Sequence, residues 1–212
     1  MNLIEKLARS QGINNEEPNK QLAAEIVRSQ NSEAVSELQE IIKDSPNLDT
    51  LSDVLKVIEA IGESKPELVS STFGIIKPLL AHKSNKIQWR AMSALSTFAS
   101  FHMKAIYNDL PEILTLMDQG SVITRDHGVK ILLELYKKEE YRQAISHLLN
   151  EQVLIAPDNQ LGQYAEKWLE IIKKDDIPEL IKVVEIRQPE LEKPSHQKRI
   201  ERVLLKLHKK LK

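Results

Sequence analysis

Apolar residues recur along the chain in four columns at a constant spacing of 37 residues. The columns are Ile61, Phe98, Leu135 and Ile172; Ile58, Leu95, Leu132 and Leu169; Val57, Ala94, Ile131 and Trp168; and Ile42, Leu79, Leu116 and Val153. A fixed period of this size is typical of stacked supersecondary units, none of which buries its apolar face alone. The pattern therefore predicts one repeat domain over residues 1–212.

Each 37-residue unit contains two apolar stripes with the i, i+3, i+4, i+7 spacing of an amphipathic helix. The low content of six Gly and nine Pro also favours helix over a turn-rich β-protein. The stripes predict a capping helix at 20–30 and helix pairs over 34–62, 70–101, 109–137, 141–173 and 178–211. The last pair is atypical and ends in a basic helix. We therefore predict an all-α fold, a right-handed α-α superhelix (solenoid) of about five antiparallel helix pairs.

Local signals mark the breaks between these helices. The stretch 46–49 separates the two helices of the first pair, and Gly120-Ser121 supplies a turn and an N-cap. Gly62 follows an apolar stripe, where a left-handed residue would end a helix. Gly128 lies inside a helix in a column of small residues, which predicts close packing between neighbouring helices.

The helix pairs with their Leu, Ile and Ala core resemble the HEAT family of armadillo-like α-solenoids over residues 34 to 211. HEAT units carry an Asp in the loop and a Val-Arg pair early in the second (B) helix. Here Asp118 precedes Val122 with the nearest arginine at Arg125, and Ile87 precedes Trp89-Arg90. The resemblance implies a curved stack whose B helices line a concave face, and a non-enzymatic interaction or scaffold module that binds a partner there.

The repeat register predicts which B-helix side chains face outward. If columns 54, 57, 58 and 61 face the core, columns 52, 53 and 56 point away from it. Trp and Tyr beside Arg are typical anchors of protein interfaces. The predicted partner-binding residues are Trp89, Arg90, Arg125, Lys130, Tyr164 and Lys167. An alternative is that Trp89 packs into the groove between helices.

Charge is distributed unevenly between the two ends of the chain. Residues 1–64 hold six basic and twelve acidic side chains, whereas residues 193–212 hold eight basic and one acidic, although the net charge is only −1. A basic helix can dock an acidic protein, a nucleic acid or an anionic membrane surface, or can be a solvated cap. The residues of this possible anion or nucleic-acid patch are Lys198, Arg199, Arg202, Lys206, Lys209 and Lys210.

A weaker resemblance connects the chain to the HEAT-like alkylpurine DNA glycosylases, whose cleft carries Trp, Asp and Arg. Trp89 and Arg125 match two of these roles. The position one turn after the tryptophan, which holds the carboxylate in that family, is Ser93. The resemblance implies, as an alternative, a nucleic-acid-binding solenoid that lacks the catalytic carboxylate. The pI of 6.6 argues against a phosphate-binding groove along the whole chain.

Known catalytic motifs are absent from the sequence. There is no cysteine, and no two of the six histidines share a helix at i, i+4. The adjacent carboxylates Glu16-Glu17 and Asp175-Asp176 resemble solvated surface rather than an acid–base pair. We therefore expect no catalytic residue, metal or cofactor, a protein or peptide partner, no membrane span and a cytoplasmic location. The oligomeric state stays open, including a purely structural assembly subunit.

Overall fold

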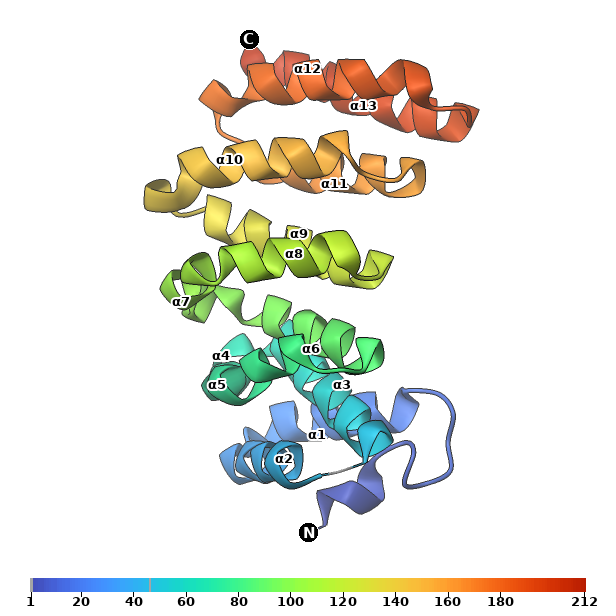
Figure 1. The fold of residues 1–212 in the computed structure, drawn as a ribbon, viewed down its shortest axis with the longest axis vertical. Coiled ribbons are helices and arrows are strands. Elements are labelled where there is room, and N and C mark those ends of the chain that lie inside the picture. Colours follow the sequence, from blue (N-terminus) through green and yellow to red (C-terminus); the bar gives the residue numbers. More distant parts are fainter. Residues whose placement is uncertain (1, 46) are drawn as a thin grey trace. The chain divides into compact units, whose positions relative to one another are not determined.

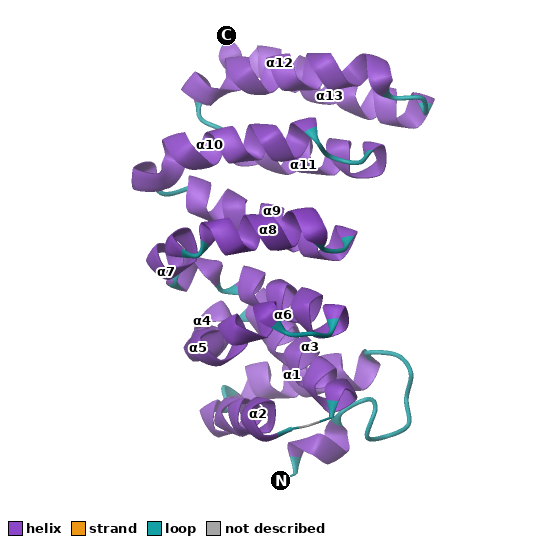
Figure 2. Cartoon of the chain, viewed as in Figure 1, coloured by secondary structure: helices purple, strands orange, loops and turns teal. Residues whose placement is uncertain are grey.

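The computed structural model describes residues 2–45 and 47–212, and this part of the chain is all-α (Figure 2). The prediction of an all-helical protein is confirmed. The chain divides into two compact units, Met1–Gly128 and Val129–Lys212. Figure 1 labels the helices of both units.

The first unit is built around three long helices that lie against one another. Helix α3 packs between α1 and α6, while α2 contacts α3 and the short helices α4 and α5 (Figure 1). The α-helices in order are α1 (Glu17–Ser29), α2 (Ser32–Asp44), α3 (Leu48–Ser64), α4 (Pro66–Val69), α5 (Phe73–Ile76), α6 (Asn85–Thr97), α7 (Met103–Asn108), α8 (Leu110–Gln119) and α9 (Val122–Tyr136), within which the division falls. Four 3-10 segments accompany them: η1 (Leu3–Lys6), η2 (Ser70–Thr72), η3 (Lys77–Ala81) and η4 (Ala99–Phe101).

Side-chain caps explain where several of these helices begin. Asn31 Oδ1 accepts a hydrogen bond from Ala34 N at 2.9 Å, and Asn47 Oδ1 accepts from Asp49 N at 2.8 Å. Ser121 Oγ accepts from Thr124 N at 3.3 Å, as the predicted N-cap of α9 requires. Each contact satisfies a backbone donor that the first turn of a helix leaves free. Of the predicted break at 46–49, Pro46 lies outside the described residues.

The predicted first helix of the second pair is not continuous. The stretch 66–81 is divided into α4, η2, α5 and η3. Pro78 has no N–H to donate to the carbonyl of Gly74, and its ring crowds that carbonyl, so an α-helix cannot run through this point. Glycine at 74 further weakens the helix. The chain therefore tightens into 3-10 turns here.

The second unit contains two consecutive helix pairs. They are α10 (Glu139–Leu154) with α11 (Asp158–Ile171), and α12 (Ile177–Arg187) with α13 (Pro194–Leu211), joined by η5 (Lys174–Asp176) and η6 (Gln188–Glu190). Helix α10 packs on α12 and α11 packs on α13, so like positions of the two pairs contact each other. These four helices lie at the predicted stretches 141–173 and 178–211, with α10 beginning two residues earlier, at Glu139.

The repeat columns identify much of the core. Every member of the columns that begin at Val57 and Ile61 is at most 3% exposed. The column that begins at Ile42 is less regular, because Leu79 and Leu116 are only half-buried. Burial of a large aliphatic side chain contributes about 1.5–3 kcal/mol, so these columns stabilise the helix pairs substantially.

Two glycines act through close packing rather than through turns. The prediction of a left-handed Gly62 is wrong, because Gly62 lies inside α3 and its φ is not positive. A Cβ at Gly62 would lie 1.9 Å from Thr97 Oγ1 on α6, and one at Gly128 would lie 2.3 Å from Met117 Cγ on α8. The predicted close approach at Gly128 agrees with this geometry. Both glycines let a second helix approach more closely than any larger residue would allow.

Gly62→Ala should therefore destabilise the protein although alanine favours helix. We expect a loss of about 1–2 kcal/mol, because overpacking costs about 1–3 kcal/mol and the helix-propensity gain is about 1 kcal/mol at most. Gly74→Ala is the matched control, because a Cβ there meets nothing within 4 Å. Urea denaturation should show it to be neutral or slightly stabilising. Equal effects of the two substitutions would contradict the steric explanation.

Candidate functional site

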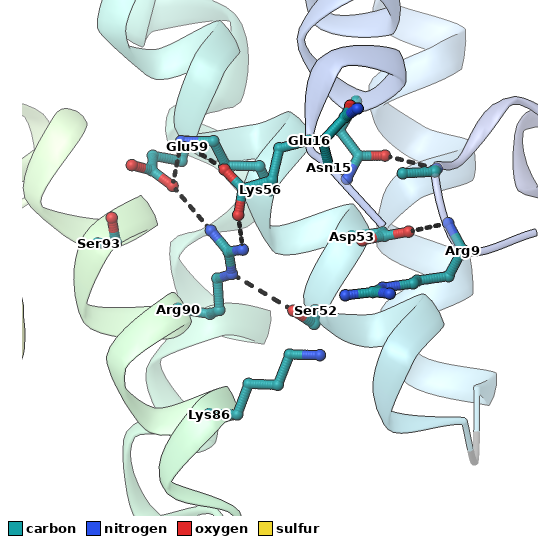
Figure 3. A network of polar contacts seen from close by, with 12 residues as sticks. Arg9, Asn15, Glu16, Ser52, Asp53, Lys56, Glu59, Lys86, Arg90 and Ser93 are labelled. Carbon is teal, nitrogen blue, oxygen red and sulfur yellow. Dashed lines mark hydrogen bonds and ion pairs between the residues drawn. The ribbon is translucent and has the colours of Figure 1, made fainter. Parts of the chain in front are cut away.

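Arg90 on α6 is the centre of a charged network that joins α6, α3 and the segment before α1. Its side chain is almost fully buried and forms an ion pair with Glu16 (Figure 3). Its Nε donates to Ser52 Oγ at 3.3 Å, and Nη1 lies 3.8 Å from Glu59 Oε2. A buried charge needs partners of this kind, because its transfer out of water is otherwise very costly.

Lys56 completes the neutralisation of the two carboxylates. Its Nζ lies 3.1 Å from Glu59 Oε2 and 3.7 Å from Glu16 Oε2. Burial alone would raise the pKa of Glu16, but the hydrogen bond and positive charge of Arg90, with Lys56, outweigh it and lower that pKa. Two cations and two carboxylates therefore balance within the network.

The N-terminal segment is tied to the same helices by backbone contacts. Arg9 N donates to Asp53 Oδ2 at 2.8 Å, and Ala8 N donates to Asn19 Oδ1 at 2.9 Å. Asp53 and Asn19 are both buried. These bonds hold the segment that carries Glu16 against α1 and α3.

Trp89 lies beside this network and is held by it. The Arg90 guanidinium carbon is 4.2 Å from the centroid of the Trp89 ring, within the range of a cation–π contact. Trp89 is half-buried, so part of the indole stays accessible to solvent. Because Arg90 is fixed by its ion pairs, the indole stacks on a support that is itself immobilised.

A serine–histidine cluster lies further along α6. Ser93 Oγ is 2.9 Å from His127 Nε2, and Ser96 Oγ is 2.9 Å from His127 Nδ1. Ser96 Oγ donates its proton to Ser93 O, so His127 Nδ1 donates to Ser96 Oγ. In the neutral ring, Nε2 then accepts from Ser93 Oγ. Ser93 is 1% exposed, so a substrate carbonyl cannot reach its hydroxyl. The cluster satisfies buried polar groups at this helix contact.

The prediction that Arg90 and Tyr164 face outward is wrong. Both are buried, at 7% and 1% exposure. The reason lies in the packing of the B helices, since α6 lies on α3 and α11 lies on α13. A B helix that packs against the B helix of the next unit buries a second face, in addition to the face toward the other helix of its own pair. Arg90 and Tyr164, which both belong to column 53, lie on that second face.

The other predicted partner-binding residues lie nearer the surface. Arg125, in the first unit, is half-buried, and its Nε donates to Met117 O at 3.3 Å. Lys130 and Lys167, in the second unit, are half-buried. Trp89 and Arg125 therefore remain candidates in the first unit, and the two lysines in the second.

The prediction that Asp175-Asp176 is solvated surface is wrong for Asp176, which is half-buried. It accepts hydrogen bonds from Tyr136 Oη at 2.6 Å and from Ser146 Oγ at 2.8 Å. The pKa of Tyr136 is raised above its ordinary value, mainly because the phenol is buried and secondly because it donates a hydrogen bond to Asp176. Tyr136 Oη also accepts from Lys173 N at 2.8 Å, so this cluster fixes the turn after α11.

The basic patch on α13 splits into structural and exposed members. Arg199 forms two hydrogen bonds with Glu166, at 2.9 and 2.5 Å, which lower the pKa of Glu166. Lys210 Nζ donates to Leu169 O and Ile172 O at the end of α11. The remaining members are exposed: Lys198, Arg202, Lys206 and Lys209.

Sequence reasoning missed the network around Arg90 because its partners are far apart in the chain. Glu16 lies 74 residues from Arg90 and outside the repeat. The available signal was in α3, where Ser52, Lys56 and Glu59 follow the three- and four-residue spacing of one helix face. Lys56 and Glu59, three residues apart on that face, are the signal for an ion pair on α3.

Comparison with known proteins leaves the family of the chain open. No family model matches the sequence, and no curated protein matches it. Among solved structures, the chain is similar to an engineered protein from the Northeast Structural Genomics Consortium, with a TM-score of 0.61 and 17% identity over 99% of this chain and 98% of that one. At this identity the likeness shows the fold alone.

Residues 2–45 and 47–212 contain neither a membrane-crossing helix nor a metal-binding cluster. No helix there combines the length and apolar character needed to cross a bilayer. No group of three or more His, Cys, Asp or Glu side chains in the same ranges is arranged to hold a metal ion.

Proposed function

We propose that the chain is a HEAT-like solenoid that binds a protein segment on the α6 face of its first unit, with Trp89 as the anchor. The supporting observation is the half-buried indole stacked 4.2 Å from Arg90, whose guanidinium is fixed by Glu16 and Glu59. A rigid aromatic group with little conformational freedom to lose is the kind of side chain that dominates interface energetics. Arg125 on α9 is the second predicted partner-binding residue that stays half-buried in this unit.

The repeated helix pairs support the architectural part of this proposal. The 37-residue period and the packing of α10 on α12 and α11 on α13 fit a stack of units. Repeat proteins of this kind present an extended surface to a partner. The buried position of Ser93 supports a binding role rather than a nucleophilic one.

Peptides selected on the wild-type protein from a phage-displayed library provide a test. Trp89→Ala should weaken the selected peptides at least about 30-fold, which is the loss of about 2 kcal/mol expected of an interface hot spot. Lys104→Ala, on exposed α7, should leave their affinity unchanged. Equal binding by Trp89→Ala, or selection of no peptide, would contradict the proposal.

Fluorescence gives an independent readout, because the chain has only two tryptophans. Trp168 is fully buried, so Trp168→Phe leaves Trp89 as the single reporter. Binding at the proposed site should shift Trp89 emission to the blue and protect it from iodide. Peptide binding without either change would place the partner elsewhere.

A further inference from the structure

Two helix faces at opposite ends of the sequence carry opposite charge in the same pattern. On α2, Glu33, Glu37, Glu40 and Asp44 recur at steps of four, three and four residues and so form one stripe, here named the acidic stripe. On α13 the exposed residues Lys198, Arg202, Lys206 and Lys209 form the basic stripe. The two ends of each stripe are 11 residue steps apart, or about 16 Å along the helix.

Each stripe lies opposite the buried face of its helix. Leu38 and Ile42 point into the core from α2, and Val203 and Leu207 do so from α13. The charged faces are therefore turned away from the core of their own units. On α2, Glu37 also accepts a hydrogen bond from Leu3 N at 2.8 Å. Lys43 lies at the edge of the acidic stripe, with Nζ 2.7 Å from Glu40 Oε1.

Apolar groups accompany the charges in a complementary way. Leu205 is 70% exposed in the middle of the basic stripe. The acidic stripe borders a depression of about 360 Å³ that is lined by Ile4, Glu37, Glu40, Ile41, Asp44 and Ser45. Ile4 is 38% exposed at its rim. Leu205 of the basic stripe could therefore enter the depression beside the acidic stripe.

We infer that the basic stripe of one molecule docks on the acidic stripe of a second copy, with Leu205 in the depression beside Ile4 and Ile41. The two stripes match in length and are opposite in charge, which steers such an encounter and fixes its register. Because the two surfaces differ, the contact is heterologous, and repetition gives a ring or an open chain of molecules. A nucleic acid would use the cations but not Leu205, since phosphate contacts are made by polar and charged groups.

Sedimentation of the full chain over a concentration series tests the inference. The wild type should form larger species at low salt, and raising NaCl from about 0.05 to 0.5 M should weaken association at least about tenfold through screening. Glu40→Lys with Asp44→Lys, or Arg202→Glu with Lys206→Glu, should each give a monomer. Lys182→Glu with Glu179→Lys on α12 is the control, because it alters exposed charges outside both stripes.

Mixing the two charge-reversed variants distinguishes this contact from any other. Each variant retains one intact stripe that matches the intact stripe of the other, so the mixture should associate although each variant alone is a monomer. A wild type that stays monomeric at low salt, reversed variants that associate like wild type, or a mixture that does not pair would each overturn the inference. Labelled duplex DNA that binds a monomeric wild type through Arg202 and Lys206 would also overturn it, by assigning the basic stripe to phosphates. These outcomes are independent of peptide binding at Trp89.

Discussion

Arg90→Ala should lower the free energy of unfolding by about 3 kcal/mol, because removal of one partner from a buried ion pair costs about 3–5 kcal/mol. The substitution leaves Glu59, at 6% exposure, with Lys56 as its remaining cationic partner at 3.1 Å. That remaining partner places the expected loss near the lower end of the range. Urea denaturation followed by circular dichroism measures it.

Lys86→Ala is the matched control for this prediction. Lys86 pairs with Asp49 at 2.8 Å between the same two helices, but both side chains are solvent-accessible. An exposed pair of this kind contributes about 1 kcal/mol or less. Adding Glu59→Gln to Arg90→Ala should restore part of the stability, since it removes the uncompensated charge. If Arg90→Ala costs no more than Lys86→Ala, the network does not stabilise the fold.

Acid should weaken the same network in the wild type. The pKa of Glu16 is lowered in the folded protein from its ordinary value of 4.5. A carboxyl group of this kind contributes stability above about pH 4.5 that is lost as the pH falls through its folded-state pKa. In Arg90→Ala this part of the acid dependence should disappear, because Arg90 is the main group that lowers the pKa.

The helix pairs could be predicted from the sequence because they depend on local periodicity. The stripes that place α11, α12 and α13 lie within single helices, and a spacing of three or four residues defines their buried face. The interruption at Pro78 is also predictable, since proline breaks a helix at any position beyond its first turn. The apolar stripe around it favours a continuous helix, but Pro78 does not permit one.

The surroundings of the outward columns could not be predicted in the same way. Whether Arg90 or Trp89 meets solvent depends on how closely α6 approaches α3, and that distance depends on Gly62 and Thr97. The repeat register gives the direction of a side chain on its own helix but not what lies opposite. Glu16 lies outside the repeat altogether, so no column could pair it with Arg90.

Trp168→Ala should be among the most destabilising single substitutions in the second unit, with a loss of about 3–5 kcal/mol. Trp168 is fully buried, and its ring packs edge-on against Tyr136 with centroids 6.1 Å apart. Truncation leaves a cavity beside Tyr136, whose hydroxyl bonds Asp176 and Lys173 N. The damage should therefore extend to the turn after α11.

Trp168→Phe separates the packing of Trp168 from its polar group. Within the described part of the chain, Trp168 Nε1 is buried without a hydrogen-bond partner. Phenylalanine removes this unsatisfied donor while it keeps most of the aromatic volume, so the expected loss is below about 1.5 kcal/mol. Thermal and urea unfolding of both variants measure the difference. Equal losses for Trp168→Ala and Trp168→Phe would mean that the indole N–H has a stabilising role, and that volume alone does not explain this position.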